Sequence, residues 1–163
     1  MNEPKSATGS RLSEIMGVSH DSVNRFLLRE SSEPKDLFNE AQSTWNLIGG
    51  TVSVDDSVLD KPYSQPMELV SYFGSGKPHL TVTGWNLITW YYTDIHDQHL
   101  PVNYRVDDQS EGKTKNDYFL ERLAEVLEWG LKPILMTKDS WYSCVTNLKK
   151  VKNHQIRTYA RHI

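Results

Sequence analysis

The sequence contains a single cysteine, Cys144, in 163 residues. One cysteine excludes an internal disulfide framework and any zinc site built from cysteines. Long apolar runs are also absent, since no stretch approaches the roughly 20 residues that a membrane-spanning helix needs. The opening stretch, MNEPKSATGSR, is polar and lacks the apolar core of a secretory signal. These absences predict a cytoplasmic protein that does not cross a membrane.

No sign of charge dominates the whole chain, whose net charge is −3, but the charge is unevenly distributed. Residues 1–30 carry no net charge, whereas residues 138–163 carry six Lys or Arg and one acidic residue. The residues between them are therefore strongly acidic. An acidic centre followed by a basic tail suits a metal-binding body beside a segment that contacts phosphates. The alternative interpretation is a solvated charge asymmetry without a function.

Three parts are predicted along the chain. Residues 1–30 have the pattern of two short helices, residues 31–50 are expected to form a connector, and residues 51–163 show an α/β pattern. In this last part, runs of β-branched and aromatic residues predict strands. The expected strands begin at residue 51 and then cover 67–73, 81–94, 101–108 and the start of 133–143. Gly84 is expected to form a bulge.

Residues 115–130 are the clearest predicted helix. Tyr118, Leu123 and Val126 are among the apolar residues that recur at three- and four-residue steps, and Gly130 marks the end. Several strands combined with flanking helices predict a mixed-sheet α/β domain.

The segment RLSEIMGVSHDSVNRFL, residues 11–27, fits a helix-turn-helix. Gly17 permits a left-handed turn between the two helices, and Ser19 can cap the second helix. Polar residues at the front of that helix then lie where base edges or phosphates would be. We therefore predict DNA contacts from His20, Ser22, Asn24 and Arg25. The alternative is a helical hairpin that serves only for packing.

Two adjacent carboxylates, Asp55 and Asp56, follow the apolar start of the strand at residue 51. Consecutive strand residues point to opposite faces, so only one of the two can face a given site. Asp139 follows a second apolar segment, residues 134–136. Carboxylates that converge from neighbouring strands at this end of an α/β sheet predict a Mg²⁺ site. The alternatives are an N-cap at Asp139 and a solvated acid pair at Asp55 and Asp56.

The order and spacing of these motifs resemble the DDE transposases of bacterial insertion sequences. The resemblance rests on VDDSVLDKPY (54–63), a long strand region and KDSWYS (138–143), preceded by LSEIMGVSHDSVNRFL (12–27). It covers residues from about 8 to about 150. It implies an RNase H-like fold, of which residues 51–163 would be an incomplete copy. It also implies DNA transposition by phosphodiester cleavage and strand transfer that depends on Mg²⁺ or Mn²⁺.

The resemblance assigns Asp56 and Asp139 as the catalytic and metal-holding acids. Members of the family often place a hydroxyl residue directly after the first acid, and here Ser57 follows Asp56. Trp141 and Tyr142 follow Asp139 as in related proteins. Asp55 is then a supporting or solvent-facing neighbour.

The sequence departs from the family in its third acid, a Glu that the family carries on a later helix within Tyr-x-x-Arg-x-x-x-Glu. No Asp or Glu follows Asp139, and the closing stretch KNHQIRTYARHI does not have the pattern of a finished strand-helix pair. The resemblance therefore predicts a truncated transposase that is inactive, or very slow, on its own.

A non-catalytic DNA-binding fragment is the alternative function. It would bind insertion-sequence ends or inhibit an intact transposase, while the α/β body would serve for homodimer formation. Lys149 and Lys150 in the basic tail are predicted to contact DNA phosphates, with simple solvation as the alternative. His96 and His99 have a spacing that could hold a metal, although we favour a loop between two strands.

Overall fold

The computed structural model describes residues 9–60, 70–74 and 81–161. Contacts within the chain divide it into two compact units, residues 1–33 and 34–163. Within the described ranges, no helix is long and apolar enough to span a bilayer.

The amino-terminal unit contains two helices, α1 (Gly9–Met16) and α2 (His20–Arg29). Gly17 joins them with a φ of 64°, a conformation that glycine adopts without strain. Ser19 caps α2, because its hydroxyl accepts a hydrogen bond from the backbone N–H of Ser22 at 3.1 Å. The two helices and their turn therefore lie where the sequence predicts them.

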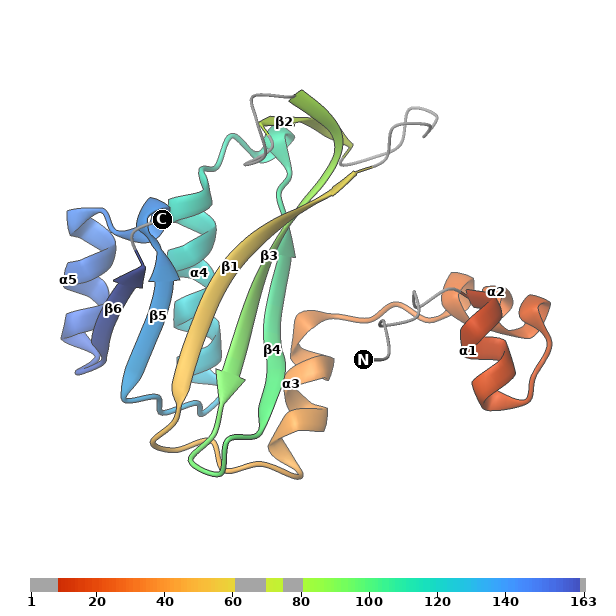
Figure 1. Ribbon diagram of the computed structural model, residues 1–163, viewed down its shortest axis with the longest axis horizontal. Coiled ribbons are helices and arrows are strands. Elements are labelled where there is room, and N and C mark those ends of the chain that lie inside the picture. Colours follow the sequence, from red (N-terminus) through yellow and green to blue (C-terminus); the bar gives the residue numbers. More distant parts are fainter. Residues whose placement is uncertain (1–8, 61–69, 75–80, 162–163) are drawn as a thin grey trace. The chain divides into compact units, whose positions relative to one another are not determined.

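The second unit contains a six-stranded mixed sheet (Figure 1). Its strands are β1 (Thr51–Asp60), β2 (Ser71–Gly74), β3 (Thr81–Thr93), β4 (His99–Val106), β5 (Leu135–Asp139) and β6 (Arg157–Arg161). The order is β2-β3-β1-β5-β6, and β4 also pairs with β3. β1 lies antiparallel to β3 and parallel to β5, which is parallel to β6. The predicted mixed-sheet α/β class is confirmed.

The long predicted strand at 81–94 is confirmed as β3, but its predicted bulge at Gly84 is wrong. Gly84 pairs in regular register with Asp60 of β1 and with Ser71 of β2. The irregularity lies between Trp90 and Tyr91, where β3 pairs with β4. β4 contains Pro101, which has no N–H to donate to the ladder, and this residue suits a bulge better than Gly84 does. Of the strand expected at 67–73, residues 67–69 lie outside the described residues.

Helix α4 (Lys115–Glu128) covers one face of the sheet, and Figure 1 shows it behind the strands. A capping box begins it, since the Thr114 hydroxyl accepts from the backbone N–H of Asp117 while the Asp117 carboxylate accepts from that of Thr114. Phe119 of α4 packs against Trp90 of β3, with ring centroids 5.3 Å apart. The buried core of this unit therefore lies between α4 and the sheet. Its buried members on the two elements include Val52, Val54, Ile88, Trp90, Tyr118, Phe119, Leu123, Val126 and Met136.

Residues 31–50, which were expected to form a connector, include helix α3 (Pro34–Gln42). Phe38 and Ala41 of α3 are buried. The Phe38 ring lies 5.3 Å from the ring of Trp129, which follows α4. This part of the chain therefore contributes to the core of the second unit.

Gly50 determines how the chain enters β1. Its backbone N–H donates to the hydroxyl of Tyr92 at 3.0 Å, and that hydroxyl donates to the carbonyl oxygen of Asn46 at 3.0 Å. A Cβ atom at Gly50 would lie 2.2 Å from the carbonyl oxygen of Thr93. Only glycine fits at this position. The close approach fixes the start of β1 against β3, and so fixes which residues of β1, including Asp55 and Asp56, face each side of the sheet.

After β5 come the short helix η2 (Ser140–Tyr142), helix α5 (Val145–Asn153) and β6. A further short helix, η1 (Gln109–Glu111), precedes α4. The closing stretch, which was expected to lack a finished strand-helix pair, does contain a strand, because Arg157–Arg161 pair in parallel with β5. Buried Ile156 anchors the start of this strand, and the backbone N–H of Arg157 donates to the carbonyl of Ile134 at 3.0 Å.

Candidate active site

The alternation of β1 separates Asp55 from Asp56. Val52 and Val54 are buried on the face that α4 covers, and Asp56 lies on this face, with its side chain 14% exposed. Asp55 is exposed on the other face, and one of its carboxylate oxygens accepts from the backbone N–H of Asp56 at 2.9 Å. The two acids therefore face different surroundings, and the one chosen by resemblance lies against the core.

The carboxylate of Asp56 forms an ion pair with the ammonium of Lys115 in the first turn of α4. These residues are 59 positions apart in the chain. Lys115 was not predicted as a site residue. The sequence does contain one indication of this role. A lysine in the first turn of a helix interacts unfavourably with the helix dipole, so its presence there suggests a negatively charged partner elsewhere in the fold.

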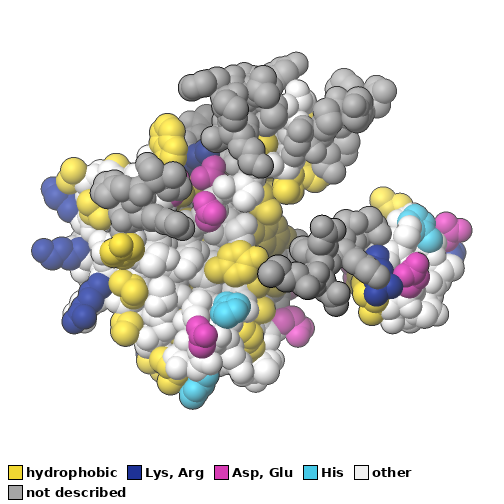
Figure 2. All heavy atoms as spheres, in the orientation of Figure 1, with side chains coloured by type: hydrophobic (Ala, Val, Ile, Leu, Met, Phe, Trp, Pro, Cys, Tyr) yellow, Lys and Arg dark blue, Asp and Glu magenta, His cyan; other side chains and the backbone are white. Residues whose placement is uncertain are grey.

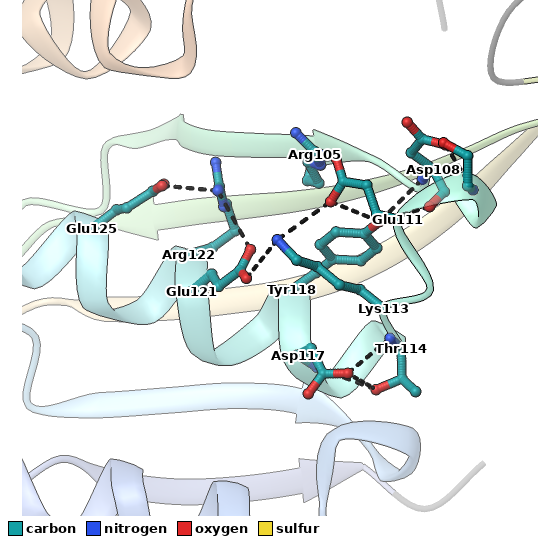
Figure 3. A network of polar contacts seen from close by, with 11 residues as sticks. Arg105, Asp108, Glu111, Lys113, Thr114, Asp117, Tyr118, Glu121, Arg122 and Glu125 are labelled. Carbon is teal, nitrogen blue, oxygen red and sulfur yellow. Dashed lines mark hydrogen bonds and ion pairs between the residues drawn. The ribbon is translucent and has the colours of Figure 1, made fainter.

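Polar contacts link the segment between β4 and α4 to the first turns of α4 (Figure 3). Lys113 lies between two carboxylates, 3.3 Å from Glu111 and 2.7 Å from Glu121. The hydroxyl of Tyr118 donates to the carbonyl of Asp108 at 3.0 Å. Burial raises the pKa of Glu111, but Lys113 and Arg105 outweigh it and hold that pKa below its usual value. This charged segment is therefore internally paired.

Asp139 ends β5 and caps η2. One of its carboxylate oxygens accepts from the backbone N–H of Ser140 and from the hydroxyl of Ser140, the latter at 3.0 Å. Asp139 therefore does act as an N-cap, which was the alternative role predicted from the sequence. β5 pairs in parallel with β1 up to Lys138 and Val54, so Asp139 lies at the same level of the sheet as Asp55.

Tyr142 of η2 is a buried residue that was not predicted as a functional residue. Its side chain is fully buried and stacks on Phe119 at 5.3 Å, and its hydroxyl has no hydrogen-bond partner among the described residues. Burial raises the pKa of Tyr142, and nearby carboxylates raise it further. Those carboxylates belong to Asp56, Asp55, Asp139 and Asp107, and we call these four residues the carboxylate cluster.

Asp107, the member of the carboxylate cluster that the sequence did not indicate, follows β4 directly. It is 9% exposed, and its carboxylate accepts from the side-chain amide of Asn86 at 3.3 Å. Its backbone N–H donates to the carbonyl of Asn86 at 2.8 Å. Asp107 therefore brings a nearly buried negative charge to the covered face of the sheet.

The donor chemistry of the cluster suits a hard divalent cation, since Mg²⁺ is commonly held by one or two carboxylates with water as the remaining ligands. Asp56 and Asp139 are the residues that the sequence predicts to hold such an ion, although Asp139 lies level with Asp55 rather than with Asp56. Across the described ranges, no three His, Cys, Asp or Glu side chains form a group that could hold one metal together. Among the described residues, an ion at this place would therefore have at most two such side chains as ligands.

The predicted DNA-contacting residues of α2 are all exposed. The Asn24 amide lies 3.2 Å from a ring nitrogen of His20, and the Arg25 side chain donates to the carbonyl of Asp21 at 3.3 Å. Ser22 instead lies 2.8 Å from the hydroxyl of Ser19 and lines an apolar groove between the helices. The structure therefore places His20 and Asn24 side by side on one surface of α2, whereas Ser22 adjoins the groove.

Lys149 and Lys150 project from α5 in the second unit, where Asn147 and Val151 form its buried side. Figure 2 shows Lys and Arg side chains gathered over α5. This exposed surface has the charge that a phosphate backbone requires.

His96 and His99 lie at the turn between β3 and β4. A carboxylate oxygen of Asp94 accepts from the backbone N–H of His96 at 2.8 Å and from that of Gln98 at 3.0 Å. Burial raises the pKa of Asp94, but these hydrogen bonds outweigh it and lower the pKa overall. A turn closed by Asp94 therefore accounts for this segment, in agreement with the favoured loop interpretation.

Neither a protein-family model nor a curated protein matches the chain. Among solved structures, a piggyBac transposase synaptic complex with hairpin DNA is similar at 12% identity and a TM-score of 0.48, covering 94% of this chain and 36% of that one. The Mos1 strand transfer complex shares 12% identity at a TM-score of 0.41, covering 94% and 53%. The Drosophila P element transposase strand transfer complex shares 6% at 0.36, covering 97% and 42%. This chain spans about half or less of the length of these proteins.

Proposed function

We propose that the chain is a transposase-related, DNA-binding protein of DDE type with an RNase H-like body. Asp56 and Asp139 are its metal-holding acids. The observation that carries the proposal is the placement of Asp56, which lies 14% exposed on the covered face of β1 and is paired with Lys115 of α4, while Asp139 ends the neighbouring parallel strand β5. This arrangement agrees with the resemblance of VDDSVLDKPY and KDSWYS to the DDE motifs of bacterial insertion sequences.

In this proposal Asp56 and Asp139 hold Mg²⁺ or Mn²⁺, which when bound activates a water or hydroxyl and stabilises the leaving oxygen of a phosphodiester. The lysines of α5 and the polar residues of α2 bind the DNA backbone and base edges. We place this activity in the cytoplasm and expect insertion-sequence ends as the substrate.

We expect strand cleavage by this chain alone to be absent or very slow, because no acid follows Asp139 to supply the third carboxylate. Incubation with supercoiled plasmid and Mn²⁺ tests this expectation. Rapid nicking that disappears in both Asp56→Ala and Asp139→Ala would show that two acids suffice for cleavage. It would overturn the expectation that the chain alone is inactive.

A second candidate is a non-catalytic DNA-binding fragment that occupies element ends or pairs with an intact transposase. The exposed surface formed by His20, Asn24 and Arg25 favours it. Duplex DNA binding should weaken with rising salt, and Arg25→Ala should lower the salt slope by about one phosphate contact. Arg29→Ala is the matched control, since Arg29 is already paired with Glu30 at 2.6 Å. Absence of duplex binding at low salt would remove this candidate and the DNA-binding half of the first.

A further inference from the structure

Lys115 is the cation that contacts the carboxylate cluster. Among the described residues, it is the only cationic side chain that forms an ion pair with one of the four cluster acids. Lys138 is buried close by, but its ammonium donates to the hydroxyl of Ser143 at 2.7 Å. Lys113 forms ion pairs with Glu111 and Glu121. The negative charge of Asp56 is therefore balanced by Lys115.

The backbone at Lys115 is fixed on several sides. The capping box of Thr114 and Asp117 begins α4 at this residue. The next residue, Asn116, accepts from the side-chain amide of Asn147 at 2.7 Å, which ties the first turn of α4 to α5. Only the side chain of Lys115 is therefore free to reorient.

The side chain of Lys115 has room to move, because it is 35% exposed while that of Asp56 is 14% exposed. A long lysine side chain can pivot on its flexible stem and keep its ammonium in water. If the ammonium leaves Asp56, it stays tethered to the first turn of α4. That region favours negative groups such as a phosphate.

The Lys115 ammonium contacts one carboxylate oxygen of Asp56, so a divalent cation on this carboxylate would compete with it. We propose that Lys115 is a tethered counter-cation that neutralises Asp56 in the metal-free protein and moves to a DNA phosphate when a divalent ion binds. The inference rests on the proposed metal-holding role of Asp56. It makes Lys115 a positioning residue that couples metal loading to DNA contact.

The test measures Mn²⁺ binding to the intact chain by electron paramagnetic resonance. Lys115→Met should bind Mn²⁺ about fivefold more tightly than the unaltered protein, because a competing cation is gone. Lys113→Met removes the same charge two residues away and should change affinity less than twofold. Lys115→Gln provides a second variant with a polar side chain, so that a folding defect in one variant does not decide the result.

A double-mutant cycle with Asp56→Asn locates the effect. The gain from removing the lysine should vanish when Asp56 is already neutral. A gain that persists in the Asp56→Asn background, an equal gain in Lys113→Met, or no gain in either Lys115 variant overturns the inference. If Mn²⁺ binding depends on Asp56 but not on Lys115, only this inference is wrong. If no variant binds Mn²⁺, the metal half of the proposed function is wrong as well.

The second half of the inference predicts a change in DNA binding. Adding Mn²⁺ should steepen the salt dependence of duplex binding by about one phosphate contact in the unaltered protein. Lys115→Met should show no such steepening. An equal steepening in both proteins would overturn the proposed movement to phosphate.

Discussion

Tyr142 shows how a single residue can report on a site that its own neighbourhood in the sequence does not reveal. Its ring stacks on Phe119, and carboxylates that lie on β1, just after β4 and at the end of β5 raise its pKa. The sequence placed Asp56 and Asp139 in one site but could not indicate Asp107 or Lys115. Their contacts join distant parts of the chain, as the 59-residue separation of Lys115 and Asp56 illustrates.

The stability of the protein should fall as pH rises above about 10, because Tyr142 has a raised pKa when folded and an ordinary one, about 10, when unfolded. The unfolded chain then loses a proton that the folded chain keeps. Tyr142→Phe should weaken this alkaline decline and leave stability at pH 7 equal or higher, since its hydroxyl has no partner among the described residues. Urea unfolding at pH 7 and pH 11 measures both effects.

Tyr118→Phe is the matched control for that substitution. Its hydroxyl donates to the carbonyl of Asp108, so its removal should cost about 1 kcal/mol at pH 7. A loss in Tyr142→Phe at pH 7 as large as in Tyr118→Phe would show that the Tyr142 hydroxyl has a stabilising partner.

At the scale of elements, the sequence predicts best where periodicity is long. The apolar steps of residues 115–130 and the β-branched run at 81–94 gave α4 and β3 nearly to their ends. Helix α3 was missed because it is short and its few apolar residues, Leu37, Phe38 and Ala41, stand in a polar stretch, and only the fold shows that Phe38 and Ala41 are buried. Strand β6 was missed because its stability comes from backbone pairing with β5.

Gly50→Ala should disrupt the start of β1. Its new Cβ atom would lie 2.2 Å from the backbone oxygen of Thr93 and 2.6 Å from the ring of Tyr92, so both strands would have to move. We expect a loss of about 3 kcal/mol in the free energy of unfolding. Gly9→Ala is the control, because its Cβ would meet only an ordinary contact at 3.4 Å. Equal stability of the two variants would contradict the proposed close approach.

At the scale of the whole molecule, the two units differ in how much apolar surface they bury. In the described part of the amino-terminal unit, Val23 is the buried hydrophobic residue, whereas Phe26, Leu27 and Leu28 are more than half exposed. The second unit contains the continuous core beneath the sheet. Helices of 8 and 10 residues are marginal without packing, so we expect the first unit to be marginally stable on its own.

Residues 34–163 produced alone should therefore keep a cooperative thermal transition close to that of the entire chain. Residues 1–33 alone should be largely unfolded by circular dichroism. If residues 34–163 alone lacked a cooperative transition, the amino-terminal helices would be needed to complete their core.

The most direct measurement for the whole account is Mn²⁺ binding to the unaltered protein, Asp56→Asn, Asp139→Asn and Asp97→Asn. Asp97 is the matched control, because it is exposed in the β3–β4 turn and asparagine suits its φ of 61°. We predict saturable Mn²⁺ binding. Asp56→Asn and Asp139→Asn should each weaken it at least tenfold, and Asp97→Asn should leave it unchanged. Absence of saturable binding, or equal binding in all four proteins, would contradict it.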